Sequence, residues 1–226
     1  MALSDIHVVF IDDGGVLNDN HARAPQWRRL LGDYLVPCLG GTPEAWAKAN
    51  VGAFERSWDR FMTRVAEAGE SGGVDRWVRT ERARWLVDMC EQVGVATPDD
   101  PETSAVAGSI WVSERVKAEI PGAVDAVLEL ARRGIVLHTA SGGLSWELDP
   151  YLRGMGIRQH FDRLYGPDLV DRYKNGPHYH RAILADSETD PADAAVVDDW
   201  DEARMWAGSL GVRAFGSLPE LIAALG

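Results

Sequence analysis

The feature of this sequence that most constrains its fold is an apolar run that ends in two aspartates and two glycines. Residues 8–11 are Val, Val, Phe and Ile, and Asp12, Asp13, Gly14 and Gly15 follow them. An apolar run of this length, rich in β-branched residues and bounded by turn formers, predicts a short buried strand and a tight turn. In an open α/β sheet, ligands bind at the carboxyl ends of the strands. An Asp-Gly turn is common, however, so the rest of the chain has to supply partners for these carboxylates.

Beyond residue 121, strand-like and helix-like segments alternate. Four further strands are predicted, over residues 135–139, 161–165, 194–199 and 212–215. Between them apolar residues recur at helical spacing, and Ser217 with Glu220 forms a capping box that opens a last helix. Strands that alternate with helices imply parallel βαβ units. The predicted fold class is therefore α/β, with a Rossmann-like parallel-sheet core.

Residues 20–116 have a different pattern, which predicts an all-helical insertion. Apolar stripes at helical spacing occupy residues 27–35, 54–65 and 85–93, and a further helix is expected from about residue 104 to 117. The tryptophans on these stripes are expected to lie in the core of the insertion rather than to stack on a ligand. The predicted domains are a catalytic core of residues 1–19 and 117–226, and a helical cap of residues 20–116.

Composition narrows the classes of partner and the cellular environment. The 226 residues carry a formal net charge of −12, which disfavours nucleic acid and anionic membranes because both require clustered Lys and Arg. No segment approaches the ~18–20 apolar residues needed to span a bilayer, and the first residues lack the pattern of a secretory leader. Cys38 and Cys90 lack zinc-site spacing and are expected to be buried free thiols. We therefore expect a cytoplasmic protein with a small-molecule partner.

Polar residues with mutually consistent chemistry close or follow the predicted strands. Thr139 closes the second strand, Lys174 follows the third, and Asp198 with Asp199 closes the fourth. In a parallel sheet these strand ends lie at the same edge as Asp12. A carboxylate nucleophile can form a covalent aspartyl intermediate, while a hydroxyl and an ammonium bind the oxygens of the transferred group. A second carboxylate can hold Mg²⁺.

The order and spacing of these residues resemble the haloacid dehalogenase superfamily over essentially the whole chain. The resemblance implies that Asp12 is the nucleophile and that Thr139 and Lys174 are the catalytic residues of the second and third motifs. It also implies a Mg²⁺ site with these ligands: Asp12, the Gly14 carbonyl, Asp199 and Asp198. The insertion matches the helical caps of that superfamily, which close over the site, exclude water and select the substrate. The implied substrate is a small phosphorylated or otherwise anionic molecule.

Two positions depart from the pattern of the superfamily. Gly14 stands where most of its phosphatases carry a second Asp, which protonates the leaving group and later activates water. Loss of a general acid/base typically costs roughly 10²–10⁴-fold in rate. Ala203 stands where the fourth motif has its last Asp, and the nearby residues available to compensate are Asp198, Asp201 and Glu202. Asp13 is expected to point away from Asp12 and to stabilise the turn, since successive strand residues face opposite sides.

Three functions are compatible with these residues. The first is a Mg²⁺-dependent phosphatase with an aspartyl-phosphate intermediate, suited to leaving groups that need little protonation, such as acyl phosphates or activated esters. The second is cleavage of a carbon–halogen or carbon–phosphorus bond. The acidic pair counts against metal-free dehalogenases, and Lys48 is the only clear cap candidate for the lysine that phosphonate-cleaving members require. The third is a catalytically silent protein that binds a phosphate-bearing ligand or another protein. The missing acid at Gly14 favours this third function, whereas retention of Asp12, Thr139, Lys174 and Asp199 argues against it.

Overall fold

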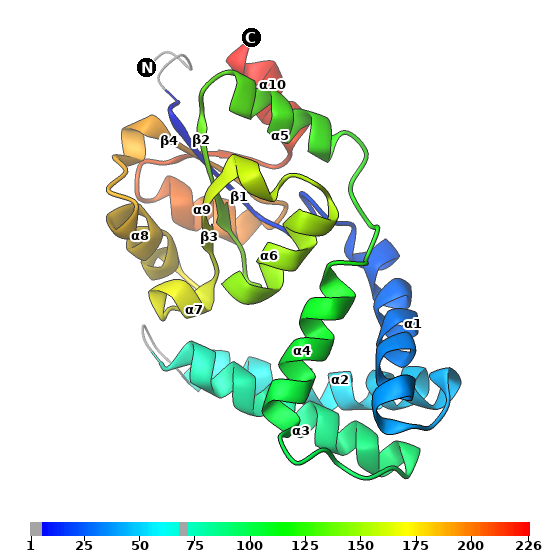
Figure 1. The fold of residues 1–226 in the computed structure, drawn as a ribbon. Coiled ribbons are helices and arrows are strands. Elements are labelled where there is room, and N and C mark those ends of the chain that lie inside the picture. The colour runs from blue at the N-terminus through cyan, green and yellow to red at the C-terminus, as the bar shows by residue number, and fades with distance from the viewer. Residues whose placement is uncertain (1–5, 68–71) are drawn as a thin grey trace.

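The computed structural model describes residues 6–67 and 72–226, and a five-stranded sheet lies at its centre (Figure 1). The strands in chain order are β1 (Val8–Ile11), β2 (Val136–Ala140), β3 (Phe161–Tyr165), β4 (Ala194–Val197) and β5 (Arg213–Phe215). Their spatial order is β3-β2-β1-β4-β5, and every neighbouring pair is parallel. The predicted α/β, Rossmann-like class is confirmed.

Helices cover both faces of this sheet. They are α5 (Ala123–Arg132), α6 (Ser145–Gly154), α7 (Pro167–Val170), α8 (Pro177–Asp186), α9 (Asp201–Gly208) and α10 (Leu218–Leu225). Ile11 packs into the apolar core formed with α5, α6 and α10, whereas its neighbour Phe10 packs into the core formed with α8 and α9. Because alternate strand residues face opposite sides, the continuous apolar run of β1 is buried on both faces of the sheet.

The described part of the insertion forms four helices, which lie together at one end of the molecule (Figure 1). They are α1 (Asn20–Leu39), α2 (Pro43–Glu67), α3 (Val74–Val93) and α4 (Pro101–Ser113). The carboxylate of Asp100 caps α4 by accepting a hydrogen bond from the Thr103 N–H, so this helix begins earlier than the apolar pattern predicts. The domain boundaries at residues 19 and 116 stay a prediction.

Only part of the predicted apolar stripes forms the core of the cap. Trp46 and Trp85 are buried at its centre. On α2, however, Phe54, Trp58 and Met62 have 54%, 51% and 49% of their surface exposed. The expectation that the tryptophans of the stripes lie in the cap core is therefore wrong for Trp58. The reason is that α1 and α3 pack on the face of α2 that carries Trp46 and two small alanines.

Both thiols are free, but only one of them is buried. Cys90 is free and buried, as predicted, whereas Cys38 is free but exposed, so the expectation of burial is wrong for Cys38. Cys38 lies in the last turn of α1, where its side chain faces solvent. Among residues 6–67 and 72–226, no helix combines the length and the apolar character needed to cross a bilayer.

The two segments that join the cap to the core run side by side. Asn18 forms an antiparallel bridge with Glu119, and the Asp19 N–H donates to the Ala118 carbonyl at 2.8 Å. The carboxylate of Asp19 also caps α1. The turn after β1 is therefore continuous with the start of the cap, and residues early in α1 are placed next to the Asp12 turn.

A second contact between cap and core lies beside the loop that carries Lys174. The Val74 N–H at the start of α3 donates to the carboxylate of Asp171 at 2.8 Å. Further along α3, Arg82 forms an ion pair of 2.5 Å with Glu147 of α6. These contacts hold the far end of the cap against the edge of the sheet where the strands end.

Candidate active site

Asp12 and Asp198 lie side by side where β1 and β4 end. Ile11 and Val197, the last residues of these strands, are paired in the parallel register, and the Asp12 N–H donates to the Val197 carbonyl at 2.9 Å. Carboxylate oxygens of Asp12, Asp198 and Asp199 all lie within 4.8 Å of one another. The register of two strands that are far apart in sequence thus assembles a group of three carboxylates.

Lys174, in the loop between α7 and α8, bridges two of these carboxylates. Its ammonium lies 3.2 Å from Asp12 Oδ1 and 2.6 Å from Asp198 Oδ2, and its side chain is only 6% exposed. Burial alone would lower the pKa of Lys174, but the charges of Asp12 and Asp198 outweigh it and raise the pKa above its ordinary value. Lys174 is therefore positively charged at neutral pH.

The single ammonium does not balance the three carboxylates. Burial raises the pKa of Asp198 above its ordinary value, and Asp12 adds to the rise while Lys174 opposes it. Burial and then the charge of Asp12 also raise the pKa of Asp199. A cation between these groups would relieve the repulsion, and a set of carboxylate oxygens suits a hard divalent ion such as Mg²⁺. The residues present therefore fit the predicted metal.

Asp199 lies against Gly15, a position with no room for a side chain. Gly15 has a φ of +89°, and a Cβ built there would overlap the carboxylate of Asp199. Its N–H donates to the Asn18 carbonyl at 2.8 Å, which closes the turn after β1. Both the backbone conformation and the close approach of Asp199 require glycine at this position.

Gly15→Ala is expected to lower the affinity for Mg²⁺ at least about tenfold, because the methyl group displaces a carboxylate of the predicted metal site. It should also lower the free energy of unfolding by about 1–3 kcal/mol through the positive φ. Gly122→Ala is the matched control, since Gly122 has a φ of +84° and open space around its Cβ position. Calorimetric titration with Mg²⁺ and thermal unfolding measure the two effects. Equal Mg²⁺ affinity in both variants would contradict the assignment of Asp199.

The family model of haloacid dehalogenase-like hydrolases matches residues 6–208. This match covers most of the chain and includes the strand ends that carry the three carboxylates. This chain belongs to the haloacid dehalogenase-like hydrolase family.

Solved structures of family members share the fold. The L-2-haloacid dehalogenase RSc1362 is 16% identical, covers 97% of this chain and 98% of its own, and has a TM-score of 0.62. An L-2-haloacid dehalogenase from Xanthobacter autotrophicus, with chloropropionic acid covalently bound, is 17% identical. The match covers 92% of this chain and 76% of that dehalogenase, with a TM-score of 0.55. CbbY from Rhodobacter sphaeroides, in complex with phosphate, is 19% identical. The match covers 92% of this chain and 84% of CbbY, with a TM-score of 0.53. At such identities the likeness establishes the fold alone. A search of curated proteins finds no match.

Thr139, the predicted residue of the second family motif, lies within β2 and is fully buried. It pairs with Ile11, one residue before Asp12, and its hydroxyl donates to the Tyr165 carbonyl at 3.0 Å. Among the described residues, the hydroxyl of Thr139 makes no hydrogen bond to Asp12. The strand end lies beside the carboxylates, but the hydroxyl is directed to β3, so a role for Thr139 in the reaction stays a prediction.

The fourth family motif lacks its last acid, and the structure brings only one of the three compensating candidates to the site. Ala203 is fully buried in α9. Asp201 pairs with Arg204, and neither Asp201 nor Glu202 belongs to the carboxylate group found among the described residues. Asp198 does belong to this group, because it occupies the first position after β4.

Asp13 stabilises the turn, as predicted. Its carboxylate accepts a hydrogen bond from Asn18 Nδ2 at 2.6 Å and forms an ion pair with Arg23 Nη1 at 2.6 Å. The apolar and acidic patterns do not single out Arg23. The signal that could have found it is its place in the first turn of a helix that begins just after the motif, because helical side chains tilt toward the helix N-terminus.

Two residues at the start of α8, Tyr179 and His180, also border the site. The Tyr179 hydroxyl donates to the carbonyls of Ser141 and Tyr165, at 3.0 and 3.1 Å, and so joins the ends of β2 and β3. His180 is buried, and burial, Lys174 and His178 together lower its pKa to about 3. His180 is therefore neutral at physiological pH.

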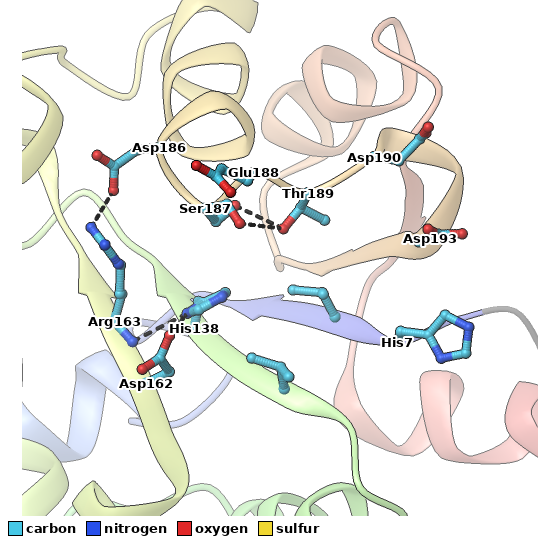
Figure 2. Close-up of a pocket in the computed structure, with 12 residues that line it drawn as sticks. His7, His138, Asp162, Arg163, Asp186, Ser187, Glu188, Thr189, Asp190 and Asp193 are labelled. Atoms are coloured by element: carbon cyan, nitrogen blue, oxygen red, sulfur yellow. Dashed lines mark hydrogen bonds and ion pairs between the residues drawn. The ribbon is translucent and has the colours of Figure 1, made fainter.

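A surface pocket of about 500 Å³ lies at the opposite edge of the sheet, where β1 and β2 begin (Figure 2). His138 lies in its wall, and its Nδ1 accepts a hydrogen bond from the Arg163 N–H at 3.1 Å. Arg163 in turn pairs with Asp186 at 2.6 Å. Since Asp12 stands at the other end of the strands, this pocket is separate from the carboxylate group.

Proposed function

We propose that this hydrolase is a Mg²⁺-dependent phosphatase that acts on small phosphate-bearing molecules, rather than on nucleic acid or membranes, with Asp12 as the nucleophile. The group of three carboxylates with one buried ammonium carries the proposal. The excess of negative charge in this group suits a divalent cation. A metal-free reaction would require only Asp12 and Lys174, whereas a bound metal ion gives Asp199, on the exposed side of the group, a role as a ligand.

The geometry supports a two-step mechanism. A carboxylate oxygen of Asp12 attacks the phosphorus and the bond to the leaving group breaks, which gives an aspartyl-phosphate. Lys174 holds Asp12 in position and binds a phosphoryl oxygen, while Asp198 fixes Lys174 at 2.6 Å and is itself held by the Trp200 N–H at 3.0 Å. A Mg²⁺ ion bound by Asp12, Asp198, Asp199 and the Gly14 carbonyl would supply charge neutralisation between the nucleophile and the phosphoryl oxygens. Water then cleaves the aspartyl-phosphate.

Removal of divalent cations by EDTA is expected to abolish the turnover of 4-nitrophenyl phosphate, and added Mg²⁺ should restore it. Asp199→Asn should raise the Mg²⁺ concentration for half-maximal activity at least about tenfold, because a charged oxygen ligand is lost. Glu202→Gln removes a nearby carboxylate that lies outside the group and serves as the control. Steady-state rates over a Mg²⁺ series measure the effect. Undiminished turnover in EDTA would overturn the metal requirement.

A carbon–halogen hydrolase is the second candidate, and the position of Lys174 favours it. An ammonium between Asp12 and Asp198 can neutralise the nucleophile without a metal, and several solved structures with this fold are L-2-haloacid dehalogenases. Release of chloride from 2-chloropropionate in the presence of EDTA would support this candidate over the phosphatase. Lys48, the cap lysine considered for carbon–phosphorus cleavage, lies on an exposed side of α2.

A further inference from the structure

The space that a side chain at position 14 would enter is already occupied. A Cβ on Gly14 would stand 2.9 Å from Asn20 Oδ1 and 3.3 Å from Arg23 Nη2. Both neighbours come from the first turn of α1, on the cap side of the Asp12 turn. The guanidinium of Arg23 therefore lies in contact with the point from which an acid at position 14 would extend.

Arg23 is fixed in this place and fully charged. It pairs with Asp13 at 2.6 Å, donates to the Asn20 side-chain carbonyl, and lies over the Tyr151 ring at 5.2 Å from its centroid. Burial alone would lower the pKa of Arg23, but the charge of Asp13 outweighs it and raises the pKa. A guanidinium has five N–H donors. Asp13 and Asn20 engage two of them in the described contacts, so donors remain for a ligand.

We propose that Arg23 is a catalytic residue that binds the departing oxygen of the leaving group in place of the absent acid at Gly14. This inference rests on the proposed phosphatase function. As Asp12 forms its bond to phosphorus, the phosphorus–oxygen bond of the ester breaks and its electron pair stays on the leaving oxygen. Arg23 donates a hydrogen bond to that anion, which leaves the site without having received a proton from the enzyme.

This assignment names the class of substrate. A guanidinium stays protonated in proteins, so it stabilises a negative charge but transfers no proton. The leaving groups that suit such a site depart as stable anions, as carboxylates do from acyl phosphates and acidic phenols do from aryl phosphates. Alkyl phosphates, whose alkoxides need protonation, are expected to be poor substrates.

The test is the dependence of rate on the pKa of the leaving group. For wild type, Arg23→Gln and Arg29→Gln, kcat/KM is measured with acetyl phosphate and a series of aryl phosphates. Arg23→Gln should lose about 10²-fold with the least acidic phenol, the usual effect of removing one donor to a developing anion, and much less with acetyl phosphate. Arg29 is exposed on α1 and, among the residues that the structure describes, forms its ion pair with exposed Asp33, so Arg29→Gln should match wild type. Equal losses of Arg23→Gln on every substrate would mark Arg23 as structural and overturn the proposal.

Two further variants keep the test decisive. Arg23→Lys retains the positive charge beside Asp13, so it should fold even if Arg23→Gln does not. The dependence of kcat/KM on the pKa of the leaving group should still be steeper than in wild type, because lysine lacks the planar set of N–H donors of a guanidinium. Gly14→Asp combined with Asn20→Ala makes room for an acid and should raise the rate with poor leaving groups. If Asp12→Asn remains active, the phosphatase function itself fails. If Asp12 is essential and neither Arg23 variant makes kcat/KM depend more steeply on the pKa of the leaving group, only the assignment of Arg23 fails.

Discussion

Asp12→Asn is expected to lower the turnover of 4-nitrophenyl phosphate by roughly 10⁴-fold or more, because it removes the nucleophile and leaves the rest of the site in place. The amide has nearly the same shape as the carboxylate, and Lys174 keeps its contact of 2.6 Å with Asp198. The loss should therefore appear in kcat, while circular dichroism and thermal unfolding remain close to wild type.

The control for this variant is Asp19→Asn, seven positions along the same segment. Asp19 caps α1 through its carboxylate, and Asn is an equally good N-cap residue, so activity should be unchanged. Mass spectrometry of acid-quenched wild-type enzyme should show a phosphoryl group on the peptide that contains Asp12. Turnover in Asp12→Asn equal to that of wild type would refute the nucleophile.

Lys174→Met is expected to lower the free energy of unfolding by about 3–5 kcal/mol at pH 8, because it leaves the buried carboxylate of Asp198 without its cation. The double variant Lys174→Met with Asp198→Asn removes both charges and should recover most of that loss, since the amide oxygen still accepts from the Trp200 N–H. Urea unfolding of the wild type and the variants measures these differences. A double variant as unstable as Lys174→Met would show that the ion pair is not the cause.

The loss in Lys174→Met should also depend on pH. Burial raises the pKa of Asp198 to about 6 even with Lys174 beside it, and removal of the ammonium raises it further. A carboxyl whose folded pKa lies above its unfolded value of about 4 loses stability as pH rises between the two values. The difference between wild type and Lys174→Met should therefore be smaller at pH 5 than at pH 8. A difference that grows on acidification would contradict this account.

Much of the site was predictable from local patterns. The apolar run before Asp12 and the run before Asp198 each indicate a buried strand, and parallel strands must end at a common edge. The position of Lys174 after β3 follows from the same argument. Thr139 shows the limit of this reasoning, because the strand end is predicted correctly but the direction of the hydroxyl, toward Tyr165, depends on the pairing of β2 with β3.

The apolar stripe of α2 shows the same limit for packing. Helical periodicity identifies Phe54, Trp58 and Met62 as one face of a helix. It does not identify which face the neighbouring helices cover, and in the structure α1 and α3 cover another one. Periodicity reports that a face exists, whereas burial depends on the partner helices.

By itself the sequence determined that strands alternate with helices, that a helical segment interrupts them after β1, and that Asp12, Lys174 and Asp198 lie at the ends or just beyond the ends of strands. These features follow from residue order and local backbone preference. Only the tertiary structure decided that Asp199 lies against Gly15 and that Arg23 stands beside Gly14. Such contacts join side chains of different elements, and their distances depend on how those elements pack rather than on the sequence of either one.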